Sequence, residues 1–170
     1  NNDRVGAIVF TDEVEMFICA LLRTQGDASD PNGHAAAELE RHLRKTAVII
    51  RREGVVPKRE HDVQAVMHKH LKNVFDGFVK NPSFATPLVT FKPDCGINDL
   101  QAAIEFKYVE TDDEMKIAFH GILEDLSGYK SKDWTRFFSV VYMTAPFETE
   151  GRFHQAIQAT GNARGWTTIL

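Results

Sequence analysis

Apolar residues recur along this chain with two different periods. In residues 60–79 they return every three or four positions, which is the pattern of an amphipathic helix. Residues 100–109 instead carry apolar side chains at every second position, as in a strand with one face on a core. Residues 137–143 are almost continuously apolar, which is typical of a buried central strand. The chain is therefore predicted to combine helices and strands.

Further elements follow from the same periods and from clusters of turn residues. The other expected helices lie at 11–23, 35–50, 111–129 and 150–159. The other expected strands lie at 5–10, 88–91 and, as an edge strand, 166–170. Loops or turns are expected at 26–33 and 96–99. Thr111 and Glu114 have the spacing of a capping box at the start of their helix.

The order of these elements indicates the fold class. After residue 60 it is helix, strand, strand, helix, strand, helix, strand, which is typical of an α/β layer structure. We expect residues 1–57 to form a mostly helical N-terminal extension and residues 58–170 to form the core. A chain of 170 residues is long enough for one domain with such an extension.

Three charged residues in the predicted hairpin have the chemistry that phosphodiester hydrolysis requires. Glu105 and Lys107 are two positions apart in a strand, so their side chains point to one face. Asp94 precedes them, and a hairpin would place it beside Glu105. Carboxylate oxygens suit Mg²⁺ or Mn²⁺, which polarise a phosphate and activate water. The alternative is an ordinary charged pair, Glu105 and Lys107, on a solvated strand.

Asp99 competes with Asp94 as the first acid, because Asp99 lies nearer to Glu105 along the chain. We prefer Asp94, because Pro93 restricts the backbone just before it and the hairpin would bring it to Glu105. Mutation of each acid would separate the two possibilities.

Pro93 and Asp94, followed by Glu105, Phe106 and Lys107, resemble the motif of the PD-(D/E)xK nuclease superfamily. That group includes type II restriction endonucleases, Holliday-junction resolvases and repair exonucleases. The resemblance covers about half of the chain. It implies a restriction-endonuclease-like core of helix, motif β-hairpin, helix and strand. It also implies that Asp94, Glu105 and Lys107 are catalytic, and that the Phe106 carbonyl joins the two acids in holding Mg²⁺ or Mn²⁺.

The resemblance extends to residues outside the motif. In many members the helix before the hairpin carries a glutamate that faces the metals, and Glu60 matches this position with Gln64 one turn later. Equally open is that Glu60 is a helix-start acid stabilised by the helix dipole. As nucleic-acid contacts we predict Gln64, Lys130, Lys132 and Arg136.

Composition modifies this picture only slightly. The net charge of −4 argues mildly against a dedicated nucleic-acid binder, although basic residues cluster between positions 41 and 72. The alternative is that these residues form a solvated face. Cys19 and Cys95 form neither a disulfide framework nor a zinc pattern, so a reducing cytoplasm is expected. No apolar run approaches the ~20 residues that span a bilayer, so no membrane association is expected.

Two functions follow as hypotheses. The first is a Mg²⁺-dependent endonuclease that cleaves DNA, of restriction or defence type, and that forms a homodimer to cut both strands. The second is a non-catalytic module of the same fold that binds nucleic acid or protein within a larger polypeptide. The acidic net charge and the start at Asn1 favour the second, whereas the intact motif favours the first.

Overall fold

The computed structural model of the protein describes residues 31–85, 90–128, 134–161 and 165–170. The chain divides into two compact units, Asn1–Glu38 and Leu39–Leu170. All described strands belong to the second unit. The strand predicted at 5–10 and the helix predicted at 11–23 lie outside the described residues.

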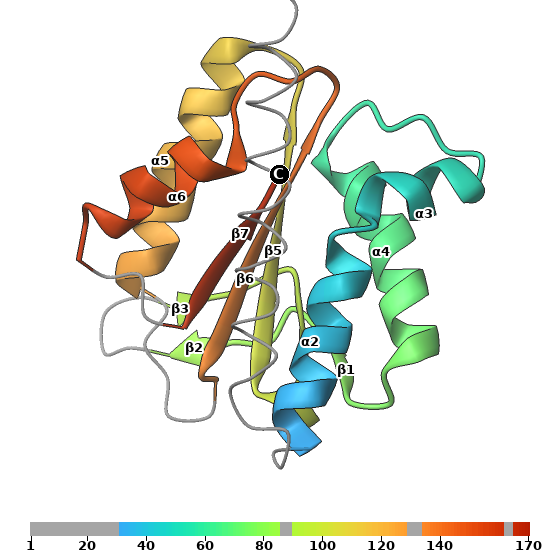
Figure 1. The fold of residues 1–170 in the computed structure, drawn as a ribbon. Coiled ribbons are helices and arrows are strands. Elements are labelled where there is room, and N and C mark those ends of the chain that lie inside the picture. Colours follow the sequence, from blue (N-terminus) through green and yellow to red (C-terminus); the bar gives the residue numbers. More distant parts are fainter. Residues whose placement is uncertain (1–30, 86–89, 129–133, 162–164) are drawn as a thin grey trace, which may run out of the picture. The chain divides into compact units, whose positions relative to one another are not determined.

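A five-stranded mixed sheet, with the order β1-β4-β5-β6-β7, is the centre of the second unit (Figure 1). Its strands are β1 (Phe78–Lys80), β4 (Cys95–Ile97), β5 (Ala102–Val109), β6 (Arg136–Met143) and β7 (Trp166–Ile169). β1, β4 and β5 pair antiparallel, whereas β6 and β7 continue parallel to β5. β2 (Phe84–Ala85) and β3 (Thr90–Phe91) form a separate pair. The predicted α/β class is confirmed, as are the central strand and the edge strand.

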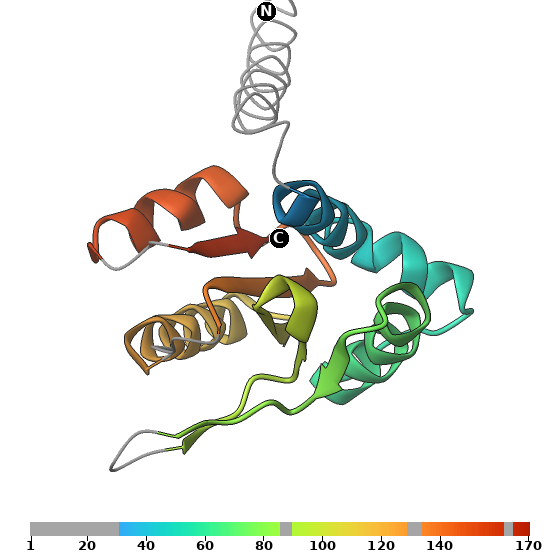
Figure 2. The ribbon, with the colours of Figure 1, turned by 90° about the horizontal axis from the view of Figure 1, so that it is seen from below.

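Helices lie on both faces of this sheet (Figure 2). α5 (Asp112–Gly128) and α6 (Glu150–Gln158) lie on one face, and each connects two parallel strands. α3 (Thr46–Arg52) and α4 (Glu60–Val74) lie on the other face. Connections of this kind are expected, because a parallel strand pair requires a crossover.

The start of α5 shows how the sequence determines a helix boundary. The Thr111 hydroxyl accepts a hydrogen bond from the Glu114 N–H at 3.2 Å, as in a capping box. The Glu114 carboxylate accepts from the N–H of Glu110 at 2.7 Å, one residue earlier than in the standard motif. The predicted cap is therefore confirmed with this small shift.

Apolar side chains fill the space between the sheet and its helices. On the α5 and α6 side, the buried cluster contains Ala103, Val109, Met115, Ala118, Ile122, Leu126, Phe137, Val141, Phe153, Ile157 and Trp166. On the other side, α4 buries Val63, Val66, Met67 and Leu71, and the His68 ring lies 6.3 Å from the Phe106 ring. β5 is therefore packed on both faces, which makes charged residues within it costly.

Two predicted helices have different bounds in the structure. The helix expected at 35–50 is two helices, α2 (Pro31–Leu43) and α3, separated at Arg44 and Lys45. Thr46 at the start of α3 donates its hydroxyl to the Leu43 carbonyl at 2.6 Å. The helix expected at 60–79 ends at Val74, because the following apolar residues pair with β4 as strand β1. Apolar spacing alone did not distinguish these outcomes.

The hairpin also differs from its prediction. β4 follows Asp94, whereas the strand predicted at 88–91 was expected to lead into that residue. Its described end, Thr90–Phe91, pairs with β2 instead. The predicted turn at 96–99 is displaced, because Gly96 pairs in β4 with Ala103 and the chain reverses through Asn98–Leu100. Within the described ranges, every helix is too short or too polar to cross a membrane.

Candidate active site

The β4–β5 hairpin brings the two predicted metal ligands together. Cys95 pairs with Ile104, so the same register places Asp94 opposite Glu105. β4 begins at Cys95, and among the described strands none pairs with β5 beyond Ile104 on that side. Asp94 therefore lies beside the part of β5 that has no described strand partner on that side.

Two donors hold the Asp94 carboxylate. The backbone N–H of Phe106 donates to Oδ2 at 2.7 Å, and the side-chain amide of Gln64 donates to Oδ1 at 2.8 Å. The same amide nitrogen donates to Glu60 Oε1 at 3.1 Å. Both residues are on α4, which begins at Glu60 as predicted. The start of α4 is therefore attached to the motif through Gln64.

The backbone of Phe106 faces the same edge. In an extended strand, the N–H and C=O of one residue point to the same side. Because the Phe106 N–H points to Asp94, its carbonyl oxygen is directed to the Asp94 edge as well. This is the orientation that the predicted role of the Phe106 carbonyl requires.

Glu105 and Lys107 form a close pair that is largely removed from water. Lys107 Nζ lies 2.6 Å from Glu105 Oε1, and the side chains are only 11% and 18% exposed. A Cβ added at Gly121 on α5 would lie 3.8 Å from Lys107 Cε, so α5 covers the stem of the lysine. The alternative of a pair on a solvated strand is therefore wrong.

Two carboxylates of this cluster, Asp94 and Glu60, have raised pKa values. Burial raises the pKa of Asp94 to about 7, and repulsion from Glu105 and Glu60 adds to this effect. The Phe106 N–H and the Lys107 ammonium act in the opposite direction. The pKa of Glu60 is also raised, mainly by burial, despite attraction by Lys107 and with repulsion from Glu105. Asp94 and Glu60 therefore resist ionisation mainly because burial disfavours the charged form of a carboxyl group.

Lys107 is the cation of this cluster. Burial alone would lower the pKa of its ammonium, but the attraction of Glu105, together with Glu60 and Asp125, raises it above the ordinary value. Lys107 therefore remains charged at neutral pH. One ammonium lies near three carboxyl groups, Glu60, Asp94 and Glu105, so acidic groups outnumber basic ones in this cluster.

This donor set fits a hard divalent cation in part. Across the described ranges, no group of three His, Cys, Asp or Glu side chains has the geometry of a complete metal site. Mg²⁺, however, is usually held by only one or two carboxylates plus waters and substrate phosphates. Asp94, Glu105 and the Phe106 carbonyl match that smaller set, and their surplus negative charge favours a cation.

Other predicted residues lie away from this cluster. Asp99 follows β4 at the turn of the hairpin, where a Cβ added at Gly77 would meet its carboxylate at 2.9 Å. Arg136 donates to the Leu100 carbonyl at 3.0 Å near the same turn and pairs with Ala102, roughly 16 Å along β5 from Lys107. The preference for Asp94 over Asp99 therefore agrees with the geometry. Arg136 is not part of the cluster.

The remaining predicted contacts have different outcomes. Lys130 and Lys132 lie outside the described residues. Gln64 uses its amide to hold Asp94 and Glu60, and its predicted contact with nucleic acid stays a prediction.

Sequence reasoning missed Ser139, a fully buried residue that pairs with Glu105 across β5 and β6. Its one signal was a hydroxyl residue inside an apolar run.

Comparisons of the chain with protein families, with curated proteins and with solved structures give no match. The assignment of function therefore rests on the chemistry of this cluster.

Proposed function

We propose that the protein is a Mg²⁺- or Mn²⁺-dependent endonuclease that cleaves DNA, with a core of the PD-(D/E)xK type. The order of elements supports this proposal: α4, then the antiparallel strands β1, β4 and β5, then α5 and the parallel strand β6. This order includes the helix, motif hairpin, helix and strand that the motif implies. A restriction or defence role in the cytoplasm is part of the proposal.

The observation that carries the proposal is the excess of carboxyl groups, one buried and two partly buried, over the single ammonium of Lys107 beside the free edge of β5. Carboxylates that are clustered away from water repel one another and lower stability, so such a cluster is a candidate functional site. A bound divalent cation would supply the missing positive charge, polarise the phosphate and activate a water molecule.

Each residue has a role in this proposal. Asp94, Glu105 and the Phe106 carbonyl hold the cation, and Glu60 adds a carboxylate at the same place. The Gln64 amide orients the carboxylate of Asp94. The Lys107 ammonium stabilises the negative charge that develops on the phosphate in the transition state. Packing of β5 between two layers of helices limits the access of bulk water to Lys107.

Cleavage of supercoiled and linear DNA by the purified chain tests the proposal. In Mg²⁺ or Mn²⁺, we expect the wild type to nick and linearise plasmid and the Lys107→Ala variant to leave it intact. Lys116→Ala is the matched control, because Lys116 is an exposed lysine of α5 that pairs with Asp113. Full activity of Lys107→Ala would exclude the mechanism. Cutting both strands is expected to involve a homodimer, visible by sedimentation.

One observation favours the second candidate, a non-catalytic module that binds nucleic acid or protein. Both oxygens of Asp94 already accept hydrogen bonds, and Glu105 already pairs with Lys107, so the cluster is satisfied without a metal. Calorimetric titration with Mn²⁺ separates the candidates. An enzyme should bind Mn²⁺ in a manner that Asp94→Asn abolishes, whereas a module of this kind should show no such binding.

A further inference from the structure

A basic groove lies between α4 and β1, beside the candidate active site. Its volume is about 470 Å³, within the range of ligand sites in proteins. One wall is a stripe of α4 that includes His61, His68 and Lys72, which recur at the spacing of one helical face. The other wall is β1, through Phe78 and Lys80.

The described residues that line the groove are basic or neutral. Lys69, Lys72 and Lys80 line it together with two histidines, and none of these described lining residues is a carboxylate. Lys69 is neutralised by Glu53 at 2.5 Å, so Lys72 and Lys80 are the lysines to test. Both are exposed. A groove of this composition favours an anionic ligand.

His68 supports this interpretation independently. Its Nε2 is buried and has no hydrogen-bond partner within the described structure, which is uncommon for a buried polar atom. Its pKa is lowered to about 4 by burial and by the charges of Lys80 and His61. Its ring lies 5.7 Å from the Phe78 ring. The groove therefore combines a neutral imidazole, an aromatic ring and free lysines.

The groove adjoins the candidate active site. Gln64 lines the groove and also donates to Asp94. On the β1 side, the N–H of Asn81, next to Lys80, donates to the Asp94 carbonyl at 3.1 Å. A chain that lies in the groove is therefore led toward Asp94.

We propose that this groove binds a single-stranded segment of DNA and directs it to the cluster around Lys107. The inference rests on the proposed function and specifies how one strand of the DNA is held beside the site. A basic groove with an aromatic ring is the arrangement by which proteins hold single strands, since lysines contact phosphates and the ring stacks on a base. The volume of the groove suits part of one strand.

Fluorescence anisotropy tests the groove without cleavage. A dye-labelled oligothymidylate of about 16 nucleotides is titrated with the protein in EDTA at several salt concentrations. We expect Lys72→Ala and Lys80→Ala each to weaken binding and to reduce the slope of log K against log salt by about 0.7. Phe78→Leu, which keeps an apolar side chain, should weaken binding about tenfold through lost stacking. Lys116→Ala, on α5, should leave both the affinity and the slope unchanged.

Each contrary outcome has a distinct meaning. The groove is excluded as the site if the wild type does not bind, or if the Lys72 and Lys80 variants bind as the wild type does. Tighter binding of a duplex through the same lysines would overturn the assignment to a single strand. Groove-dependent binding by a protein that cleaves nothing supports the groove and argues against the nuclease. Cleavage that depends on Lys107 but not on Lys72 or Lys80 supports the nuclease and argues against the groove.

Discussion

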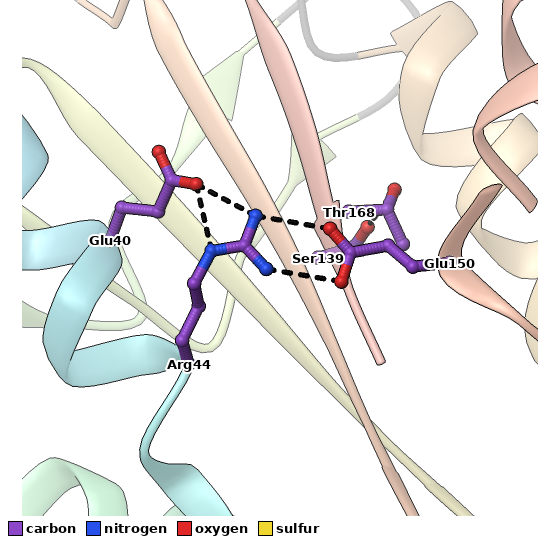
Figure 3. Close-up of polar contacts among 5 residues, drawn as sticks. All are labelled: Glu40, Arg44, Ser139, Glu150 and Thr168. Carbon is purple, nitrogen blue, oxygen red and sulfur yellow. Dashed lines mark hydrogen bonds and ion pairs between the residues drawn. The ribbon is translucent and has the colours of Figure 1, made fainter. Parts of the chain in front are cut away.

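Two charged clusters of the second unit connect helices to the rest of the fold in different ways. Arg44, just after α2, donates to Glu40 at 3.0 and 2.8 Å and to both carboxylate oxygens of Glu150 at 3.0 Å (Figure 3). These side chains are partly exposed: Arg44 by 37%, Glu150 by 39% and Glu40 by 23%. The Glu105–Lys107 pair is far more buried and has two further carboxylates near it.

The contrast shows which kind of charge cluster indicates function. The Arg44 cluster also has more acids than bases, but water screens its charges, so it costs little and contributes little. The cluster around Lys107 lacks that screening, and the pKa of Asp94 is raised as a result. Keeping these carboxylates away from water lowers the stability of the fold, so stability alone does not explain the cluster. The following experiments test this difference, beginning with the largest expected effect.

Removal of Asp94 should have the largest effect, and on activity. We expect Asp94→Ala to reduce the rate of plasmid nicking in saturating Mg²⁺ by at least about 1,000-fold, because a principal ligand of the cation is lost. Arg44→Met should cleave DNA at the rate of the wild type, because Arg44 pairs with Glu40 and Glu150, outside the candidate active site. Equal losses in the two variants would remove the distinction between the clusters.

The acids and the lysine of the motif could be recognised from the sequence because their placement is local. Strand alternation puts Glu105 and Lys107 on one face, and a short hairpin brings Asp94 to Glu105. Glu60 was predictable as the start of a helix. The positions of these residues could be predicted because they follow from spacing within one helix or one hairpin.

The rest depended on contacts between distant segments. Phe78–Lys80 continues the apolar pattern of α4, and only its pairing with β4 makes it a strand. The parallel register of β5 and β6 places Ser139 beside Glu105 in the sheet, and sequence spacing does not determine that register. The basic groove needs α4 and β1 side by side, so the basic cluster recognised at positions 41–72 included Lys69 and Lys72 but not Lys80.

Stability gives the next comparison. Without metal, Lys107→Met should lower the free energy of unfolding by about 3 kcal/mol, because it removes the buried ammonium that faces Glu105. Arg44→Met should cost less than about 1 kcal/mol, because its partners are solvated. Urea denaturation in EDTA measures both values, and similar costs would mean that burial does not separate the clusters.

Metal binding should stabilise the wild-type protein, because a divalent cation would offset the repulsion among the carboxylates around Lys107. At Mn²⁺ concentrations near 100 times the dissociation constant, the wild type should gain about 2.7 kcal/mol of stability. Asp94→Asn should show no gain, whereas Glu150→Gln, in the Arg44 cluster, should gain as much as the wild type. Thermal melts with and without Mn²⁺ provide the measurement. A gain in Asp94→Asn would place the metal elsewhere.

The pKa of Asp94 predicts a pH dependence in the absence of metal. Between its ordinary value of 3.8 and about 7, the folded protein retains a proton that the unfolded chain has lost. Stability from this group is therefore complete below about pH 4 and falls as the pH rises to 7, by at most about 1.4 kcal/mol per pH unit. Asp94→Asn should remove this decline. Urea denaturation of both proteins between pH 4 and 8 tests this prediction. If the free energy of unfolding fell equally with pH in the wild type and in Asp94→Asn, the raised pKa of Asp94 would be contradicted.

The smallest expected effect comes from a buried polar group that carries no charge. Ser139 Oγ lies 2.8 Å from Thr168 Oγ1 and accepts from Trp166 Nε1 at 3.1 Å. Ser139→Ala should cost about 1 kcal/mol, because the two partners lose one hydrogen bond each. Although Ser139 pairs with Glu105, the change should leave the Mn²⁺ gain intact, because it alters no charge. If Ser139→Ala abolished that gain, the cluster around Lys107 would depend on this hydroxyl as well as on its own charges.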